Sequence, residues 1–161
     1  MGEWVPLSGD FCTSAEEKTD GYSLRVDAAK RYTYAEYMQE TEHPEQYFGE
    51  TIQSPVLELT LTLRNTDNTD GLLPVSQFNL LNENRTIYNR YDPLYAGLKN
   101  PLLESSFGVT IRPQTEFTVH LPFTMQYGPE NCSFLEENDS GVYYLVISRY
   151  PVRKEVKITV G

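Results

Sequence analysis

The sequence predicts an all-β chain in which two antiparallel sheets pack face to face as a sandwich. Three observations predict it. Several segments alternate apolar and polar residues, turns separate most of them, and only one short stretch favours a helix. The 12 tyrosines agree with this, because tyrosine suits the pleated, half-buried surface of a sheet. An α/β fold would instead alternate strands with long helices.

The clearest strand is predicted at residues 56–64, where leucine occupies positions 57, 59, 61 and 63. Side chains of a strand point alternately to its two faces, so the four leucines should face the core. The residues between them, Glu58, Thr60, Thr62 and Arg64, should then face solvent. A turn follows at residues 65–71, which are rich in Asn and Asp.

The other strands are weaker repeats of this pattern. They are expected at residues 22–26, 75–81, 86–88, 107–111, 117–125, 142–150 and 156–160, for a total of seven or eight strands. Residues 142–150 are apolar on both faces, which indicates a central strand. Pro122 indicates an edge strand, because proline cannot donate to a ladder. The one short helix is expected at residues 34–40, with Thr33 as its cap.

We expect one domain at residues 22–161, preceded by a polar N-terminal extension, residues 1–21, that packs loosely on it. Met1-Gly2 opens the chain without a signal-peptide pattern, and the expectation is that a secretion signal or a lipid anchor was removed. The longest apolar runs are strand-sized, whereas a membrane span needs about 20 residues.

The charge excludes two classes of partner. Thirteen basic and 23 acidic side chains give a net charge of -10. Nucleic acids and anionic membranes both require a positive protein surface, so neither is an expected partner.

The two cysteines, Cys12 and Cys132, are too far apart in sequence for a CxxC pair, and no further cysteine completes a zinc site. In an exported protein they would form one disulfide that ties the N-terminal segment to a loop near the last strands. The alternative is two unpaired thiols on separate surface segments.

Three segments resemble a known family: LELTLTLRNTDNTDG, IRPQTEFTVHLPFTM and YYLVISRYPVRKEVKITV. Their order is similar to that of the telokin-like, immunoglobulin-fold domains of unknown function in Gram-positive bacterial surface lipoproteins. The resemblance covers roughly residues 20–161, and Gln114 replaces a glycine that usually follows the proline in that family. It implies an immunoglobulin-like sandwich in an extracytoplasmic location, at the bacterial cell surface or secreted, and it identifies no catalytic residue.

No pattern of catalysis or metal binding is present in the sequence. His43 and His120 are the only histidines, there is no HExxH or GxSxG motif, and no glycine-rich phosphate loop occurs. The acidic stretches 65–71 and 135–139 carry oxygen atoms that suit calcium, although neither has the EF-hand spacing. We therefore expect solvated turns there, no cofactor, and no enzymatic activity.

The remaining feature is a group of aromatic and basic residues in the expected long loop, residues 89–106. Tyr88, Tyr91 and Tyr95 lie close together in sequence, next to Arg90. Long loops on a rigid sandwich commonly carry binding surfaces. The alternative, which we favour, is that the rings pack on the sheet to cover an open edge.

The sequence thus favours a non-catalytic, extracytoplasmic domain that binds a protein or a cell-envelope component. The alternative is a carbohydrate-binding module that uses the loop tyrosines as sugar platforms.

Overall fold

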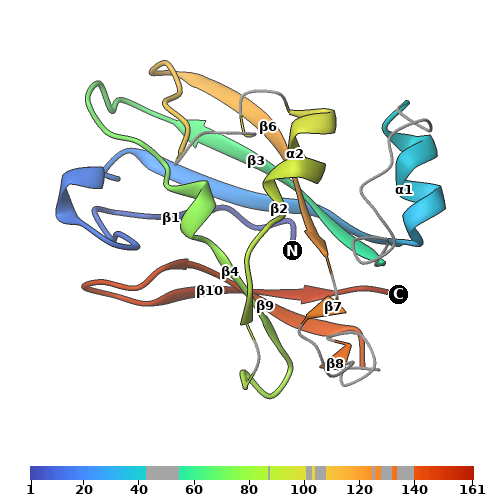
Figure 1. The fold of residues 1–161 in the computed structure, drawn as a ribbon. Coiled ribbons are helices and arrows are strands. Elements are labelled where there is room, and N and C mark those ends of the chain that lie inside the picture. Colours follow the sequence, from blue (N-terminus) through green and yellow to red (C-terminus); the bar gives the residue numbers. More distant parts are fainter. Residues whose placement is uncertain are drawn as a thin grey trace.

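A computed structural model describes residues 1–42, 55–86, 88–100, 103, 108–124, 126–127, 132–133 and 140–161, and it arranges them as two sheets packed face to face (Figure 1). For residues 88, 126, 127, 132 and 133 the description covers the backbone alone. Both sheets have four strands, and all their neighbouring strands are antiparallel. The all-β sandwich expected from the sequence is confirmed.

The first sheet is built around the leucine-rich strand. Its order is β1 (Val5–Pro6), β2 (Tyr22–Tyr32), β3 (Val56–Asn65) and β6 (Thr115–Thr124). In β3, Leu61 lies opposite Val26 of β2 and Val119 of β6, so three apolar side chains meet on the inner face. Pro122 lies in β6, which is the last strand in this order, as the missing N–H of proline indicated.

The second sheet has the order β10 (Lys154–Thr159), β9 (Val142–Ser148), β4 (Asn79–Asn82) and β5 (Tyr88–Asn89). The strand that is apolar on both faces, β9, is central, as predicted. A separate two-stranded ladder joins β7 (Gln126–Tyr127) to β8 (Cys132–Ser133).

The chain crosses between the two sheets three times. Strands β2 and β3 lie in the first sheet, β4 and β5 in the second, β6 in the first again, and β9 and β10 in the second.

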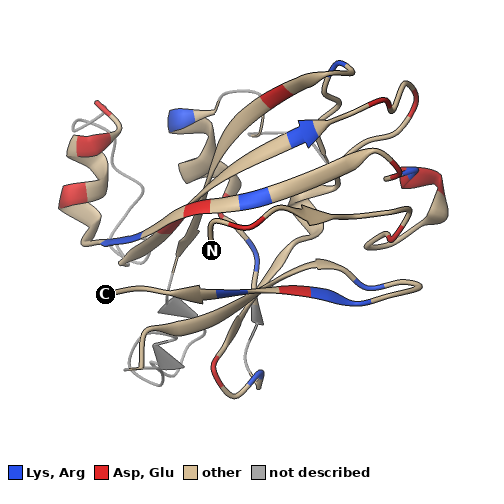
Figure 2. Ribbon diagram, turned by 180° about the vertical axis from the view of Figure 1, so that it is seen from behind, with Lys and Arg blue, Asp and Glu red and all other residues tan. Residues whose placement is uncertain are grey.

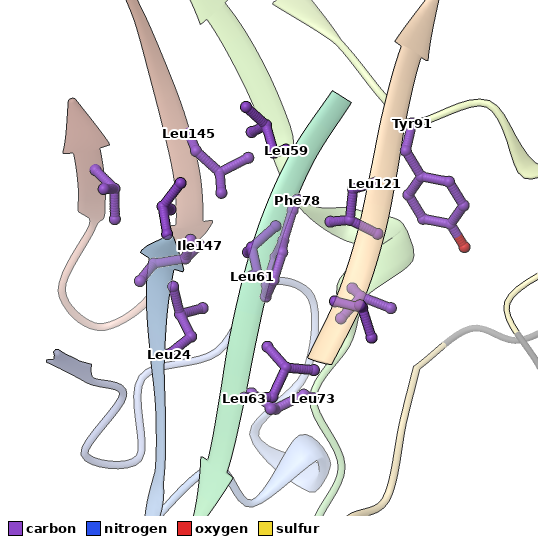
Figure 3. Packing of buried hydrophobic residues seen from close by; sticks show 14 of the residues in the cluster. Leu24, Leu59, Leu61, Leu63, Leu73, Phe78, Tyr91, Leu121, Leu145 and Ile147 are labelled. Atoms are coloured by element: carbon purple, nitrogen blue, oxygen red, sulfur yellow. The ribbon is translucent and has the colours of Figure 1, made fainter. Parts of the chain in front are cut away.

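The core lies between the sheets, where apolar side chains from both inner faces meet (Figure 3). The six residues whose burial the alternation predicted are all at most 1% exposed: Leu59, Leu61, Val119, Leu121, Leu145 and Ile147. Phe78 and Leu73, from the connection between β3 and β4, fill the space beside Leu61 and Leu63 (Figure 3).

The outer face of β3 differs from the expectation. Thr118 of β6 is exposed, and Thr60 and His120 are half-buried, but Glu58 is 4% and Thr62 is 7% exposed. The Thr62 hydroxyl donates to the Asp27 carboxylate, which lies at an irregularity of β2 and covers it. The prediction that this whole face is solvated was wrong, because other segments of the chain cover parts of it.

The N-terminal segment is part of the domain and not a loose extension. Strand β1 pairs with β2, and Leu7 and Cys12 belong to the core, with 0% and 1% exposure. The short 3-10 helix η1 (Ala15–Glu17) closes the segment. Its buried Glu17 carboxylate accepts hydrogen bonds from the main-chain N–H groups of Cys12 and Thr13, both at 2.8 Å.

Two α-helices occur in the described part of the chain, not one. Helix α1 (Tyr34–Glu40) is confirmed with the predicted cap, since the Thr33 side chain accepts from the Glu36 N–H. Helix α2 (Pro93–Lys99) was not predicted; Asp92 caps it and Pro93 is its first residue. Tyr37 of α1 packs against Tyr95 of α2 in a second apolar cluster. No helix of the described residues is long and apolar enough to cross a membrane.

Two predicted strands are shorter than the alternation suggested. The expected strand at residues 75–81 begins with the 3-10 helix η3 (Val75–Gln77), after Pro74, and only then continues as β4. Of the expected strand at residues 107–111, the described part contributes a single bridge between Val109 and Leu73.

Candidate functional site

The tyrosine surface predicted from the sequence is not formed. Tyr91 is 6% exposed and its hydroxyl donates to the Leu103 carbonyl at 3.3 Å, while Tyr95 is fully buried. Arg90 is exposed, and the Tyr88 side chain lies outside the described residues. The region folds around α2 and closes the side of the sandwich next to β6 (Figure 1). Two of the three rings thus serve packing, which overturns the prediction of a clustered recognition surface.

The predicted disulfide is not formed either. Cys12 is a free, buried thiol whose Sγ donates to the Ile147 carbonyl at 3.3 Å, close to the β9–β10 turn. Strand β8, which carries Cys132, lies at the other end of the second sheet, where β9 begins (Figure 1). The Cys132 side chain lies outside the described residues. Opposite ends of one strand are too far apart for a disulfide, because its α-carbons must lie about 4.4–6.8 Å apart.

Cys12 is expected to be unreactive in the folded protein. Burial, and after it the Glu17 carboxylate, raises the pKa of this thiol from 9.0 to about 12. The thiolate is the reactive species, so its fraction near neutral pH falls roughly a thousandfold. In a Cys132→Ser variant, a disulfide reagent such as DTNB at pH 8 should label no thiol until denaturant is added. Rapid labelling of the native variant would contradict the buried position.

The acidic turn at residues 65–71 uses its side chains to hold the main chain. Asn65 Nδ2 donates to the carbonyls of Asn68 and Ile111, at 2.7 and 2.6 Å, and Asn68 Oδ1 accepts from the Gly71 N–H at 2.6 Å. Among the described residues no group of three acidic, histidine or cysteine side chains is arranged for a metal ion. His43 and residues 135–139 lie outside that part of the chain.

Among the residues that the structure describes, the most exposed large apolar side chains lie at the turn of the β9–β10 hairpin. Tyr150 is 58% and Val152 is 55% exposed, and they flank Pro151, which follows a cis peptide bond. The sequence placed a turn here but did not indicate that its tip would be apolar. Large exposed apolar side chains that lie together mark interaction surfaces more often than single scattered ones. We name residues 149–153 the hairpin tip.

The N-terminal segment holds the hairpin tip in place. Phe11 and Tyr150 exchange main-chain hydrogen bonds, 2.6 and 3.0 Å long, and their ring centroids lie 6.0 Å apart. Inside the turn, the Ser148 hydroxyl donates to the Val152 carbonyl at 2.9 Å, while the Val152 N–H donates to the Asp10 carboxylate at 3.2 Å. The exposed rings and methyl groups thus stand on a main chain that is already ordered.

A buried ion pair secures the same base. Lys154 Nζ lies 2.8 Å from the Asp10 carboxylate and also donates to the carbonyl of Leu7 at 2.8 Å. The Asp10 side chain is only 6% exposed, so solvent screens this pair weakly. Because the base is rigid, little conformational entropy is lost when the hairpin tip binds a partner.

The hairpin tip is basic although the chain is acidic. Its residues, 149–153, include Arg149 and Arg153 and no acidic residue, against a net charge of -10 for the whole protein. Figure 2 shows Lys and Arg flanking this turn. Arg153 pairs with Glu155 at 2.6 Å, while Arg149 has no ion pair with the described residues. Tyrosine and arginine are the side chains that most often dominate binding energy at protein interfaces.

A second polar cluster lies between the two helices and the first sheet. Lys99 Nζ of α2 lies 2.8 Å from one carboxylate oxygen of the buried Glu58 and 3.0 Å from the other, and His120 Nδ1 lies 3.4 Å from Glu58. Burial, and after it the charge of Glu58, raises the pKa of Tyr37. Since Glu58 is 4% exposed and pairs with Lys99, this cluster joins α2 to the first sheet.

Comparison with known proteins gives one match. A family model described as "Domain of unknown function (DUF5028)" matches residues 1–154. No curated protein and no solved structure matches the chain. The match includes the N-terminal segment, in agreement with its packing into the core.

Proposed function

The chain belongs to the DUF5028 family of domains of unknown function, and we propose that it is a non-catalytic, extracytoplasmic domain that binds a protein of the cell envelope through its hairpin tip. The observation that carries this proposal is the exposure of Tyr150 and Val152 on a rigid, basic turn. The extracytoplasmic location rests on the resemblance of residues 20–161 to domains of bacterial surface lipoproteins.

The chemistry of the hairpin tip indicates the kind of partner. An aromatic and an aliphatic side chain, exposed on either side of Pro151, suit an apolar pocket, while Arg149 and Arg153 suit carboxylates around its rim. The expected partner is therefore an acidic protein surface with an apolar depression. Carbohydrate binding through Tyr91 and Tyr95 has lost its basis, because both rings are buried.

Site-specific crosslinking tests the binding part of this proposal. A photoreactive amino acid replaces Val152 in cells of the organism that encodes the protein, and a second strain carries it at Leu94. Leu94 is a matched control, since it is 49% exposed and lies on α2. We expect a discrete crosslinked envelope protein from position 152 only, and its loss on adding Tyr150→Ser. The same crosslinks from both positions would overturn the proposal.

A separate experiment tests the extracytoplasmic location. A tag fused to the C-terminus should be cleaved when a protease is added to intact cells. A tag that is degraded only after lysis would overturn the extracytoplasmic location, whatever the result at the hairpin tip.

A further inference from the structure

We propose that the open end of the β6 edge, Glu116 to Thr118, binds an extended peptide segment of another protein as an additional strand. This surface is separate from the hairpin tip and does not depend on the function proposed above. Three features of the described residues lead to it: the direction of the main-chain groups of β6, a cleft beside them, and the charge of the chain.

The C-terminal half of the β6 edge shows which main-chain groups point away from β3. The Asn100 side chain accepts from the His120 N–H at 3.2 Å and donates to the His120 carbonyl at 2.9 Å, in the place of a neighbouring strand. The Asp92 N–H donates to the Pro122 carbonyl at 2.7 Å, and Asn89 Nδ2 donates to the Thr124 carbonyl. The even-numbered residues thus direct their polar groups outward, and at Pro122 there is no N–H to satisfy.

The same alternation applies to the N-terminal half of the strand. Because every second residue of an antiparallel strand faces the same edge, the N–H and C=O groups of Glu116 and Thr118 point outward as well. No hydrogen bond from the described residues satisfies them. An unpaired strand edge is a template for another extended chain, which can satisfy all these groups at once.

A cleft beside this edge provides room for side chains of the added strand. It has a volume of about 360 Å³ and is lined by residues 108–112 and 115–117. Phe117 faces the same side of β6 as the buried Val119, yet it is 37% exposed, and it lines the cleft together with the buried Val109 and Ile111. An apolar side chain of the incoming strand would cover the Phe117 ring.

The occupant we infer is a peptide segment of another protein with apolar side chains at alternate positions. A second copy of this chain is a poorer occupant, since two molecules of net charge -10 repel each other. Helix α2 also flanks β6 and covers the remainder of its edge, which leaves little length for two copies of β6 to pair (Figure 1).

Amide exchange in the free protein distinguishes an open edge of β6 from an occupied one. Amide hydrogen exchange measured residue by residue by NMR should be fast at Glu116 and Thr118, and on the order of 100-fold slower at Phe117 and Val119, which face β3. Equal protection of all four amides would overturn the proposal, because the edge would then be occupied.

Binding is tested with 12-residue peptides displayed on phage. The library is first depleted on a Thr118→Pro variant and then selected on the wild-type protein. Proline at 118 removes one outward N–H and should be tolerated as Pro122 is, which a melting temperature close to that of the wild type would show. Recovered peptides should bind Thr118→Pro about tenfold more weakly or worse, and should protect the Glu116 and Thr118 amides from exchange.

Two controls separate this site from others. A Val152→Ser variant should bind the peptides as the wild type does, so failure of the hairpin tip and failure of the edge are distinguishable. Peptides with N-methyl groups at alternate amides should lose binding in one phase of the alternation only. Recovery of no peptide would overturn the proposal, and so would a dimer in sedimentation that Thr118→Pro converts to a monomer.

Discussion

Replacement of Lys99 by methionine is expected to lower the free energy of unfolding by about 3–5 kcal/mol, because it leaves a buried carboxylate without its counter-ion. Glu58 is 4% exposed, and the Lys99 ammonium contacts both of its oxygens, at 2.8 and 3.0 Å. Methionine retains most of the apolar stem that packs between the helices, so the change removes chiefly the charge. The midpoint of urea unfolding, followed by circular dichroism, measures it.

Two further variants identify the cause. A Glu58→Gln, Lys99→Met double variant should recover much of the loss, because no unpaired charge is left inside. Lys18→Met breaks an ion pair at the surface, where both side chains are more than half exposed, and should change the midpoint little. A Lys99→Met variant as stable as the wild type would show that water reaches Glu58 in solution.

The sequence predicted the strands whose burial has a local pattern. Alternation identified β3 and β6, because in both of them the opposite sheet covers one face and the pattern records which face that is. Strand β9 was identified instead by a run that is apolar on both faces. The same reasoning failed at Glu58, which it assigned to solvent. A carboxylate can be buried there only because Lys99, 41 residues further along the chain, approaches it, and alternation within one strand carries no information about such a partner.

Helix α2 was missed although the sequence contains a signal for its start. Asp92 followed by Pro93 is a typical helix start, with a capping side chain and a first residue whose φ is already suitable. Together with Gly97 and Pro101, Pro93 was instead interpreted as part of a loop at residues 89–106. Once α2 forms, Tyr91 and Tyr95 lie against the core and the second cluster, so the choice of a loop also produced the wrong site residues.

The hairpin tip could be located from sequence but not interpreted. Residues 151–154, between the strands expected at 142–150 and 156–160, were predicted to turn the chain, and turns expose their side chains. What the sequence does not show is that Phe11 and Asp10 of the N-terminal segment brace this turn, and that Asp10 also pairs with Lys154 at the start of β10. Because these contacts hold the turn, Tyr150 is exposed in a preorganised position.

Replacement of Leu61 by alanine is expected to lower the free energy of unfolding by about 2–5 kcal/mol, because it opens a cavity that the surrounding side chains cannot close. Leu61 is fully buried in the centre of β3, and Phe78 lies beside it between the sheets (Figure 3). The strands on both sides of β3 fix its main chain, so the sheet cannot collapse into the space.

The matched control for Leu61→Ala is Thr118→Ala. Thr118 lies on the outer face of the neighbouring strand and is exposed, so its loss should change stability by less than about 0.5 kcal/mol. Thr62→Ala does not serve as a control, because the Thr62 hydroxyl is buried and bonded to a carboxylate, and its removal should cost about 1.5–3 kcal/mol. In urea unfolding, the midpoints of Leu61→Ala and of Thr62→Ala should therefore both lie well below the midpoint of Thr118→Ala. Equal midpoints for Leu61→Ala and Thr118→Ala would mean that β3 does not present its leucines to the core.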